Sequence, residues 1–146
     1  MEFGADDVAL LAALRSDFPH AELHAAAPDA DGPLADWVTA LDAHVSHGAP
    51  SPDLPLDLRG TAFQVKVWRF LLSVKPGEVV SYTELAAGVG APTAVRAAAS
   101  ACAANRIGVL IPCHRALRAD GGLGGYRWGL ERKRALLDAE RKAARA

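Results

Sequence analysis

Apolar residues recur every three or four positions in several segments of the chain, and this spacing, together with residues typical of helix ends, predicts six helices. In the second segment the apolar positions form one stripe, with Pro33 at the start of the helix and Gly48 after its end. The predicted helices span residues 5–18, 33–48, 61–78, 81–90, 91–105 and 130–146.

Capping residues fix the starts of two of these helices. Thr61 and Ser81 are side chains of the type that accepts a hydrogen bond from the first turn of a helix. The last helix is predicted to turn Leu130, Leu136 and Leu137 inward and a basic face outward.

Two of the predicted helices, 81–90 and 91–105, are short and are joined by a glycine-containing turn. This arrangement is the sequence form of a helix-turn-helix, whose second helix reads DNA. That second helix is predicted to start at Pro92–Thr93 and is rich in alanine. The pattern alone leaves open whether it packs in a protein core or lies in a DNA groove.

The segment between the last two helices differs in character. Residues 107–112 form a short apolar run that predicts a buried strand or extended segment leading to Cys113. Residues 121–129 hold five glycines and predict irregular backbone. The predicted fold class is therefore α+β and mostly helical.

Charge divides the chain into two parts. Residues 1–58 hold one basic and 11 acidic residues, a net charge of −10, whereas residues 59–146 hold 15 basic and 6 acidic residues, a net charge of +9. The second part is suited to a polyanion such as nucleic acid, although the two parts would also attract each other. Three prolines in residues 49–60 indicate an extended linker, which predicts subdomains at 1–55 and 56–146.

The sequence has no apolar run that would span a membrane and no signal-peptide pattern, so a cytoplasmic location is expected. His20 and His24, and likewise His44 and His47, have a spacing that would place both rings on one helix face. No thiol or acidic partner accompanies them in a known arrangement, and we expect no metal site.

Cys113 lies between Pro112 and His114, and this neighbourhood allows two interpretations. His114 would accept the thiol proton, and a carboxylate, for which Glu140 is the candidate, would orient the imidazole. A buried cysteine is also commonly a small apolar side chain with no chemistry. The residues alone leave both interpretations open for Cys113, whereas Cys102, on the alanine face of a helix, is expected to be a core thiol.

Several motifs together resemble the O6-methylguanine-DNA methyltransferase family, and most of all its adaptive-response branch. The resemblance extends from about Leu56 to Glu140. Its motifs are FQVKVW (63–68), SYTELA (81–86), AVRAAASACAAN (94–105), PCHR (112–115) and GGYRWG (124–129).

The resemblance implies a role for each catalytic candidate. Cys113, as a thiolate of low pKa, would take the alkyl group from O6 of guanine and keep it as a thioether. His114 and Glu140 would form the water-linked relay that generates the thiolate. Asn105 would order the turn beside it. Tyr82 would displace the target phosphate and assist proton delivery to the base.

The resemblance also implies a DNA surface and a base pocket. Residues 93–102 would be a recognition helix in the minor groove, with Arg96 entering the stack that the flipped base has left. The implied partner is double-stranded DNA that carries O6-alkylguanine, bound by a monomer without cofactor. The implied DNA contacts are Tyr82, Thr93, Ala94, Arg96, Ala97 and Arg115, and the implied pocket residues are Val109, Pro112, Tyr126, Arg127, Trp128 and Lys133. Trp128 is predicted to narrow the pocket against bulky alkyl groups.

Two features depart from the family pattern. Arg106 stands where most members have proline, and only MEFG precedes the first predicted helix, where members have β-strands. The second departure leads to the hypothesis that the N-terminal subdomain is short or truncated. Three function classes follow: a suicidal repair methyltransferase, a non-catalytic alkyltransferase-like protein that binds lesions, and a redox protein that pairs Cys113 with Cys102. The presence of Cys113 favours the first over the second.

Overall fold

The computed structural model describes residues 1–27 and 32–146, which form two compact units. One unit is Phe3–Leu56, and the other joins Met1–Glu2 to Asp57–Ala146. Helices account for most of the regular structure, so the predicted mostly helical fold is confirmed. None of the described helices has the length and apolar character that a membrane crossing requires.

The unit Phe3–Leu56 contains two helices, both near their predicted positions. Helix α1 (Asp7–Asp17) is capped by Asp6, whose carboxylate accepts a hydrogen bond from the backbone N–H of Ala9 at 2.8 Å. Helix α2 (Pro33–His47) has proline at its start and ends at Gly48 in the left-handed conformation. Its apolar stripe is largely exposed, and the described part of this unit contains no strand.

In the larger unit, α3 (Ala62–Leu72) and α4 (Tyr82–Gly88) both start with a capping box, at Thr61 and Ser81 as predicted. Helix α3 is shorter than the predicted 61–78. The Ser73 hydroxyl donates a hydrogen bond to the Phe70 carbonyl at 2.6 Å. In a longer helix this carbonyl would instead accept a backbone N–H from the next turn.

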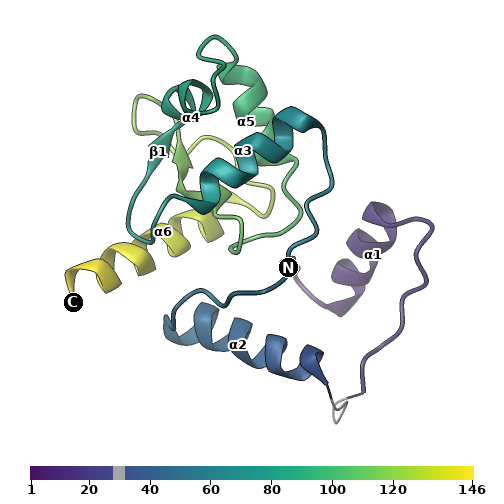
Figure 1. Cartoon of the computed structure of the whole chain (residues 1–146). Coiled ribbons are helices and arrows are strands. Elements are labelled where there is room, and N and C mark those ends of the chain that lie inside the picture. The colour runs from purple at the N-terminus through teal and green to yellow at the C-terminus, as the bar shows by residue number, and fades with distance from the viewer. Residues whose placement is uncertain (28–31) are drawn as a thin grey trace. The chain divides into compact units, whose positions relative to one another are not determined.

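Helix α5 (Val95–Ala103) packs against α3 and α4 (Figure 1). Its predicted start at Pro92–Thr93 is wrong, because a turn closes there through the hydrogen bond from Ala94 N–H to the Ala91 carbonyl. The connection between α4 and α5 is therefore longer than the predicted turn. The indole N–H of Trp68 on α3 bonds the Ala101 carbonyl on α5 at 2.8 Å and fixes the two helices together.

Two very short strands lie beside each other in parallel. Strand β1 (Val80–Ser81) pairs with β2 (Ala116–Leu117), with Val80 opposite Ala116 and Ser81 opposite Leu117. Helix α4 follows β1 directly, so the pairing fixes the start of α4 next to the segment that follows β2.

The predicted strand at 107–112 is wrong, since this segment is a series of tight turns. Val109 has a φ of 66°, and the Leu110 N–H bonds the Gly108 carbonyl at 2.7 Å across it. Pro112 lies at the centre of a second tight turn, in which the Cys113 N–H bonds the Ile111 carbonyl at 2.8 Å. The 3₁₀ turn η1 (Cys113–Arg115) and strand β2 follow.

Helix α6 (Leu130–Arg145) closes the chain, as predicted, and contacts η1. Leu137 is buried and Leu136 is half-buried, but Leu130 is 48% exposed, so its predicted inward position is wrong. The helix places Lys133 and Glu140, which are seven residues apart, toward the centre of the unit.

Candidate active site

Cys113 begins η1, and its side chain lies at a cavity of the larger unit with 3% of the residue exposed. Burial raises the pKa of the thiol, although a hydrogen bond from Asn105 and the nearby charge of Lys133 oppose the increase. The predicted low pKa is therefore wrong for the protein without substrate, in which Cys113 is a neutral thiol. A thiolate requires a base that removes the proton.

Asn105 connects the sulfur to the turns before it. Its Nδ2 lies 3.2 Å from Cys113 Sγ, 3.0 Å from the Ile111 carbonyl and 3.2 Å from the Ile107 carbonyl. Its Oδ1 accepts the Ile107 N–H at 2.9 Å. One side chain thus satisfies the backbone groups that a strand would pair, which explains why residues 107–112 form turns.

His114 and Glu140 form a direct ionic hydrogen bond, with Nε2 and Oε1 2.7 Å apart. Burial lowers the pKa of His114 more than the neighbouring carboxylate raises it, so the imidazole is neutral. Burial alone would raise the pKa of Glu140, but hydrogen bonds from His114, Arg115 and Gly77 outweigh it and hold the pKa at about 2. A neutral imidazole that donates from Nε2 carries its lone pair on Nδ1. That atom is buried and has no hydrogen-bond partner among the described residues.

Arg115 was predicted to contact DNA, and the structure contradicts this prediction. The residue is 6% exposed, and its guanidinium binds both carboxylate oxygens of Glu140, at 2.8 Å to Oε1 and 3.0 Å to Oε2. It also donates to the carbonyl of Val74. Arg115 is therefore an internal counter-ion that holds Glu140 ionised and oriented toward His114.

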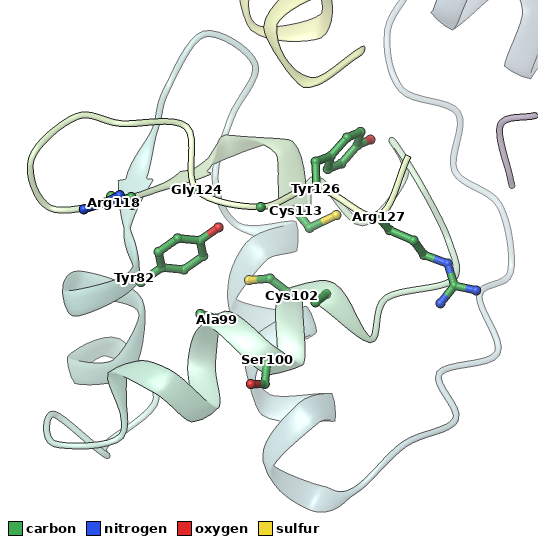
Figure 2. Close-up of a pocket in the computed structure, with 11 residues that line it drawn as sticks. Tyr82, Ala99, Ser100, Cys102, Cys113, Arg118, Gly124, Tyr126 and Arg127 are labelled. Carbon is green, nitrogen blue, oxygen red and sulfur yellow. The ribbon is translucent and has the colours of Figure 1, made fainter. Parts of the chain in front are cut away.

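The cavity at Cys113 has a volume of about 440 Å³, which is within the usual range of small-molecule sites. Figure 2 shows the Tyr82 hydroxyl directed into the space that also receives the sulfurs of Cys113 and Cys102. Arg118 and Arg127 lie at opposite ends of this view. The lining residues are Tyr82, Ala99, Ser100, Cys102, Ala103, Cys113, Arg118, Gly124, Gly125, Tyr126 and Arg127.

Tyr82 forms one wall of the cavity. Burial raises the pKa of its phenol to about 12, and the two cavity thiols add to the shift, so the hydroxyl stays protonated as a donor. The backbone of Gly124 approaches it closely, since a Cβ at this glycine would lie 2.9 Å from the ring and from the hydroxyl. The ammonium group of Lys133 lies 5.8 Å from the centre of the ring, at cation–π distance.

Lys133 is fully buried and is bonded to the glycine-rich segment. Its ammonium group donates to the carbonyls of Ala116 at 2.6 Å and Gly125 at 3.1 Å, and also to that of Leu123. The lysine supports the wall from behind, and it does not line the cavity as predicted. Val109, Pro112 and Trp128 likewise do not line the cavity, whereas Tyr126 and Arg127 do.

Trp128 therefore does not narrow this cavity against bulky groups. The residue is buried, and its ring lies against Gly108. A Cβ added at Gly108 would lie 2.9 Å from the Trp128 ring. The glycine at 108 provides this space, so the tryptophan packs under the turns that precede Cys113.

The sequence-based prediction did not place two further residues, Cys102 and Arg118, at the cavity. Cys102 was expected to be only a core thiol, yet it lines the cavity, and burial raises the pKa of its thiol to about 12. Arg118 was not singled out, although it is the arginine that directly follows β2. The described residues include no group of three His, Cys, Asp or Glu side chains that would hold a metal ion.

The predicted DNA contacts on the second helix of the pair lie toward solvent. Thr93 lies in the turn before α5, and Arg96 and Ala97 lie in its first turn; all three are exposed, and Ala94 is partly exposed. The opposite face of α5 is buried through Ala98, and Cys102 follows one turn later. One helix thus carries both the exposed candidate surface and part of the cavity.

Comparisons with known proteins agree with this arrangement. Residues 62–142 match the sequence model of the 6-O-methylguanine DNA methyltransferase DNA-binding domain. The chain is 48% identical over 137 residues to the bifunctional transcriptional activator/DNA repair enzyme Ada of Escherichia coli, covering 94% of this chain and 38% of that protein. It is 44% identical over 115 residues to a methylated-DNA–protein-cysteine methyltransferase of Mycobacterium tuberculosis, covering 79% of this chain and 70% of the relative. The crystal structure of M. tuberculosis OGT in complex with DNA matches with a TM-score of 0.70 and 45% identity, over 73% of this chain and 66% of that one.

Proposed function

Since the chain belongs to the 6-O-methylguanine DNA methyltransferase family, we propose that it repairs DNA by moving an alkyl group from O6 of guanine to Cys113. The observation that carries the proposal is the sulfur of Cys113, which lies at a base-sized cavity with Asn105 bonded to it. His114 beside it is neutral and held by the ionised Glu140. The chain spans 38% of the E. coli relative, so the proposal concerns the chemistry of this site.

The first step is the removal of the thiol proton. The Nδ1 lone pair of His114 accepts it, through a water molecule as the resemblance implies, and the imidazole becomes positively charged. The anionic Glu140 stabilises that charge across the 2.7 Å contact at Nε2. Arg115 keeps Glu140 from taking the proton itself, because it holds the pKa of that carboxyl low.

The second step is a displacement at the alkyl carbon. The thiolate of Cys113 forms the new carbon–sulfur bond, while the carbon–oxygen bond breaks and its electron pair leaves with O6 of guanine. The phenol of Tyr82, which stays protonated, gives the base a hydrogen bond or a proton as that charge develops. The product is a thioether, which is a poor leaving group, so the protein acts once and needs no cofactor.

The DNA side of the proposal rests on α5 and the cavity. A guanine must leave the duplex to reach a buried thiol, at a cost of a few kcal/mol. Arg96 is exposed at the start of α5 and fits the role of filling the vacated stack, and the small Ala97 allows close approach to a minor groove. Every group in the scheme belongs to one chain, which supports action as a monomer.

The test is the intact mass of the protein after incubation with a duplex oligonucleotide that contains one O6-methylguanine. We expect one methyl group per wild-type chain and none on Cys113→Ala. Cys102→Ala is the matched control, since it removes the second cavity thiol, and it should still accept the methyl group. Tight lesion binding without a mass change would instead identify a non-catalytic lesion-binding protein, and methylation of Cys113→Ala would refute the assignment of the nucleophile.

A further inference from the structure

The short parallel sheet brings Tyr82 and Arg118 next to each other. Ser81 pairs with Leu117 at the last position of each strand, and the two strands run in the same direction. The residues that follow, Tyr82 and Arg118, therefore leave the sheet at the same edge. Both line the cavity, and Figure 2 shows Arg118 at the end of the cavity nearer to Tyr82.

Arg118 differs from Arg115, three residues earlier, in its surroundings. Arg115 is buried in its pair with Glu140, whereas the side chain of Arg118 is 63% exposed. Its ionic partner is Asp120, with Nη2 and Oδ2 3.0 Å apart and the Asp120 side chain 62% exposed. An ion pair between two exposed groups is weak in water, so an incoming anion can replace the carboxylate.

The loop that carries this pair is ordered by its own hydrogen bonds. The Arg118 N–H bonds the Gly122 carbonyl at 2.9 Å, and the Gly121 N–H bonds the Arg118 carbonyl at 2.9 Å. The other carboxylate oxygen of Asp120, Oδ1, accepts the Gly122 N–H at 2.9 Å. Lys133 holds the next residues by their carbonyls. The guanidinium is therefore presented at the cavity from a fixed backbone.

We propose that Arg118 binds a backbone phosphate of the flipped nucleotide, and that Asp120 occupies the guanidinium until DNA displaces it. A planar guanidinium suits a phosphate, which accepts two parallel N–H bonds. A base in the cavity keeps its sugar and phosphates at the mouth, where the exposed Arg118 lies beside Tyr82. The inference rests on the proposed function and adds to it the group that holds the nucleotide in its extrahelical position.

The experiment compares Arg118→Gln, Arg118→Lys and Asp120→Asn with the wild-type protein. Asparagine at 120 keeps an oxygen for the Gly122 N–H but removes the competing charge. Arg134→Gln is the matched control, because Arg134 is an exposed arginine of α6 that does not line the cavity. Methyl transfer to Cys113 is followed by intact mass, with a duplex that contains O6-methylguanine and with the free base O6-methylguanine, which has no phosphate.

We expect Arg118→Gln to lower the rate on duplex roughly tenfold, and much less on the free base. Arg118→Lys should recover part of the loss, and Asp120→Asn should exceed the wild-type rate on duplex at low salt. The salt dependence of affinity is measured with a duplex that contains O6-methylguanine, in a Cys113→Ala background that transfers no methyl group. The slope of log affinity against log salt should fall by the equivalent of about one phosphate contact in Arg118→Gln.

Equal losses on duplex and free base would show that Arg118 supports the cavity wall, which would overturn the proposal. A rate and a salt slope for Arg118→Gln that match those of Arg134→Gln would also overturn it. The salt slope requires no methyl transfer, so it tests Arg118 even if the wild-type protein transfers nothing, a result that would count against the proposed function alone.

Discussion

The pair of Glu140 with His114 and Arg115 should make a measurable, pH-dependent contribution to stability. Glu140→Gln keeps the shape of the side chain and removes its charge, so Arg115 remains buried without a counter-ion. The pKa of Glu140 is about 2 in the fold against 4.5 for a free carboxyl. This difference corresponds to about 3 kcal/mol of stabilisation by the ionised form. The side chain is only 17% exposed, so screening by solvent reduces this value little.

The sign follows from the direction of the shift. Because the pKa of Glu140 is lowered in the fold, the stabilisation is complete above pH 4.5 and is lost as the pH falls toward 2. Urea unfolding of both proteins at a series of pH values should therefore show a difference of about 3 kcal/mol at pH 7 that shrinks to roughly half or less near pH 3.

Glu131→Gln provides the matched control, since it removes an exposed carboxylate from the first turn of the same helix. It should change the free energy of unfolding by less than about 1 kcal/mol. A difference between wild type and Glu140→Gln that stayed constant from pH 7 to pH 3 would refute the electrostatic explanation and indicate a loss of packing instead.

Other substitutions test the remaining parts of the site. Asn105→Ala removes a hydrogen-bond donor that lowers the pKa of the Cys113 thiol. Alkylation of Cys113 by iodoacetamide at pH 8 should therefore slow by roughly fivefold, which corresponds to the loss of one hydrogen bond. An unchanged rate would mean that the Asn105 amide does not affect the sulfur. Gly124→Ala introduces a Cβ at a φ of 67° and 2.9 Å from the Tyr82 ring, and it should reduce methyl transfer at least about tenfold, because small displacements of positioned groups are costly. Gly125→Ala, whose Cβ meets nothing within 4 Å, should behave like wild type, and equal losses in both variants would contradict the steric argument. Lys133→Met leaves three carbonyls without their hydrogen-bond donor. It should lower the free energy of unfolding by about 3 kcal/mol, measured by thermal or urea unfolding. An unchanged free energy of unfolding would show that water replaces the ammonium group.

Local patterns predicted the helices well, because caps and periodicity are properties of neighbouring residues. Thr61 and Ser81 begin helices as expected, since each has Gln or Glu three positions later to complete a capping box. The apolar run at 107–112 failed as a strand for a different reason. Backbone groups of Ile107 and Ile111 bond the Asn105 side chain, and the periodicity of apolar residues does not show such a partner.

The candidate site, like the fold, could be predicted only where it depends on neighbouring residues. The motif PCHR indicated Cys113 as the residue of interest, but the sequence could not show that Arg115 turns inward and Arg118 outward. That difference depends on η1 and on the pairing of β2 with β1, in which Ala116 lies opposite Val80, 36 positions earlier in the sequence. Cys102 was missed because an alanine-rich helix has no polar face to indicate which side borders a cavity.

Helix α6 sets the distance between the glycine-rich wall of the cavity and the pair of His114 with Glu140. Lys133 holds the glycine-rich wall and Glu140 holds the imidazole. Their separation of seven positions corresponds to two turns of helix, or roughly 10 Å. One inserted residue between them would rotate Glu140 by about 100° relative to Lys133, so that only one of the two could remain in place. Changes in chain length within this stretch of helix should therefore separate the glycine-rich wall from the imidazole, and the site should not tolerate them.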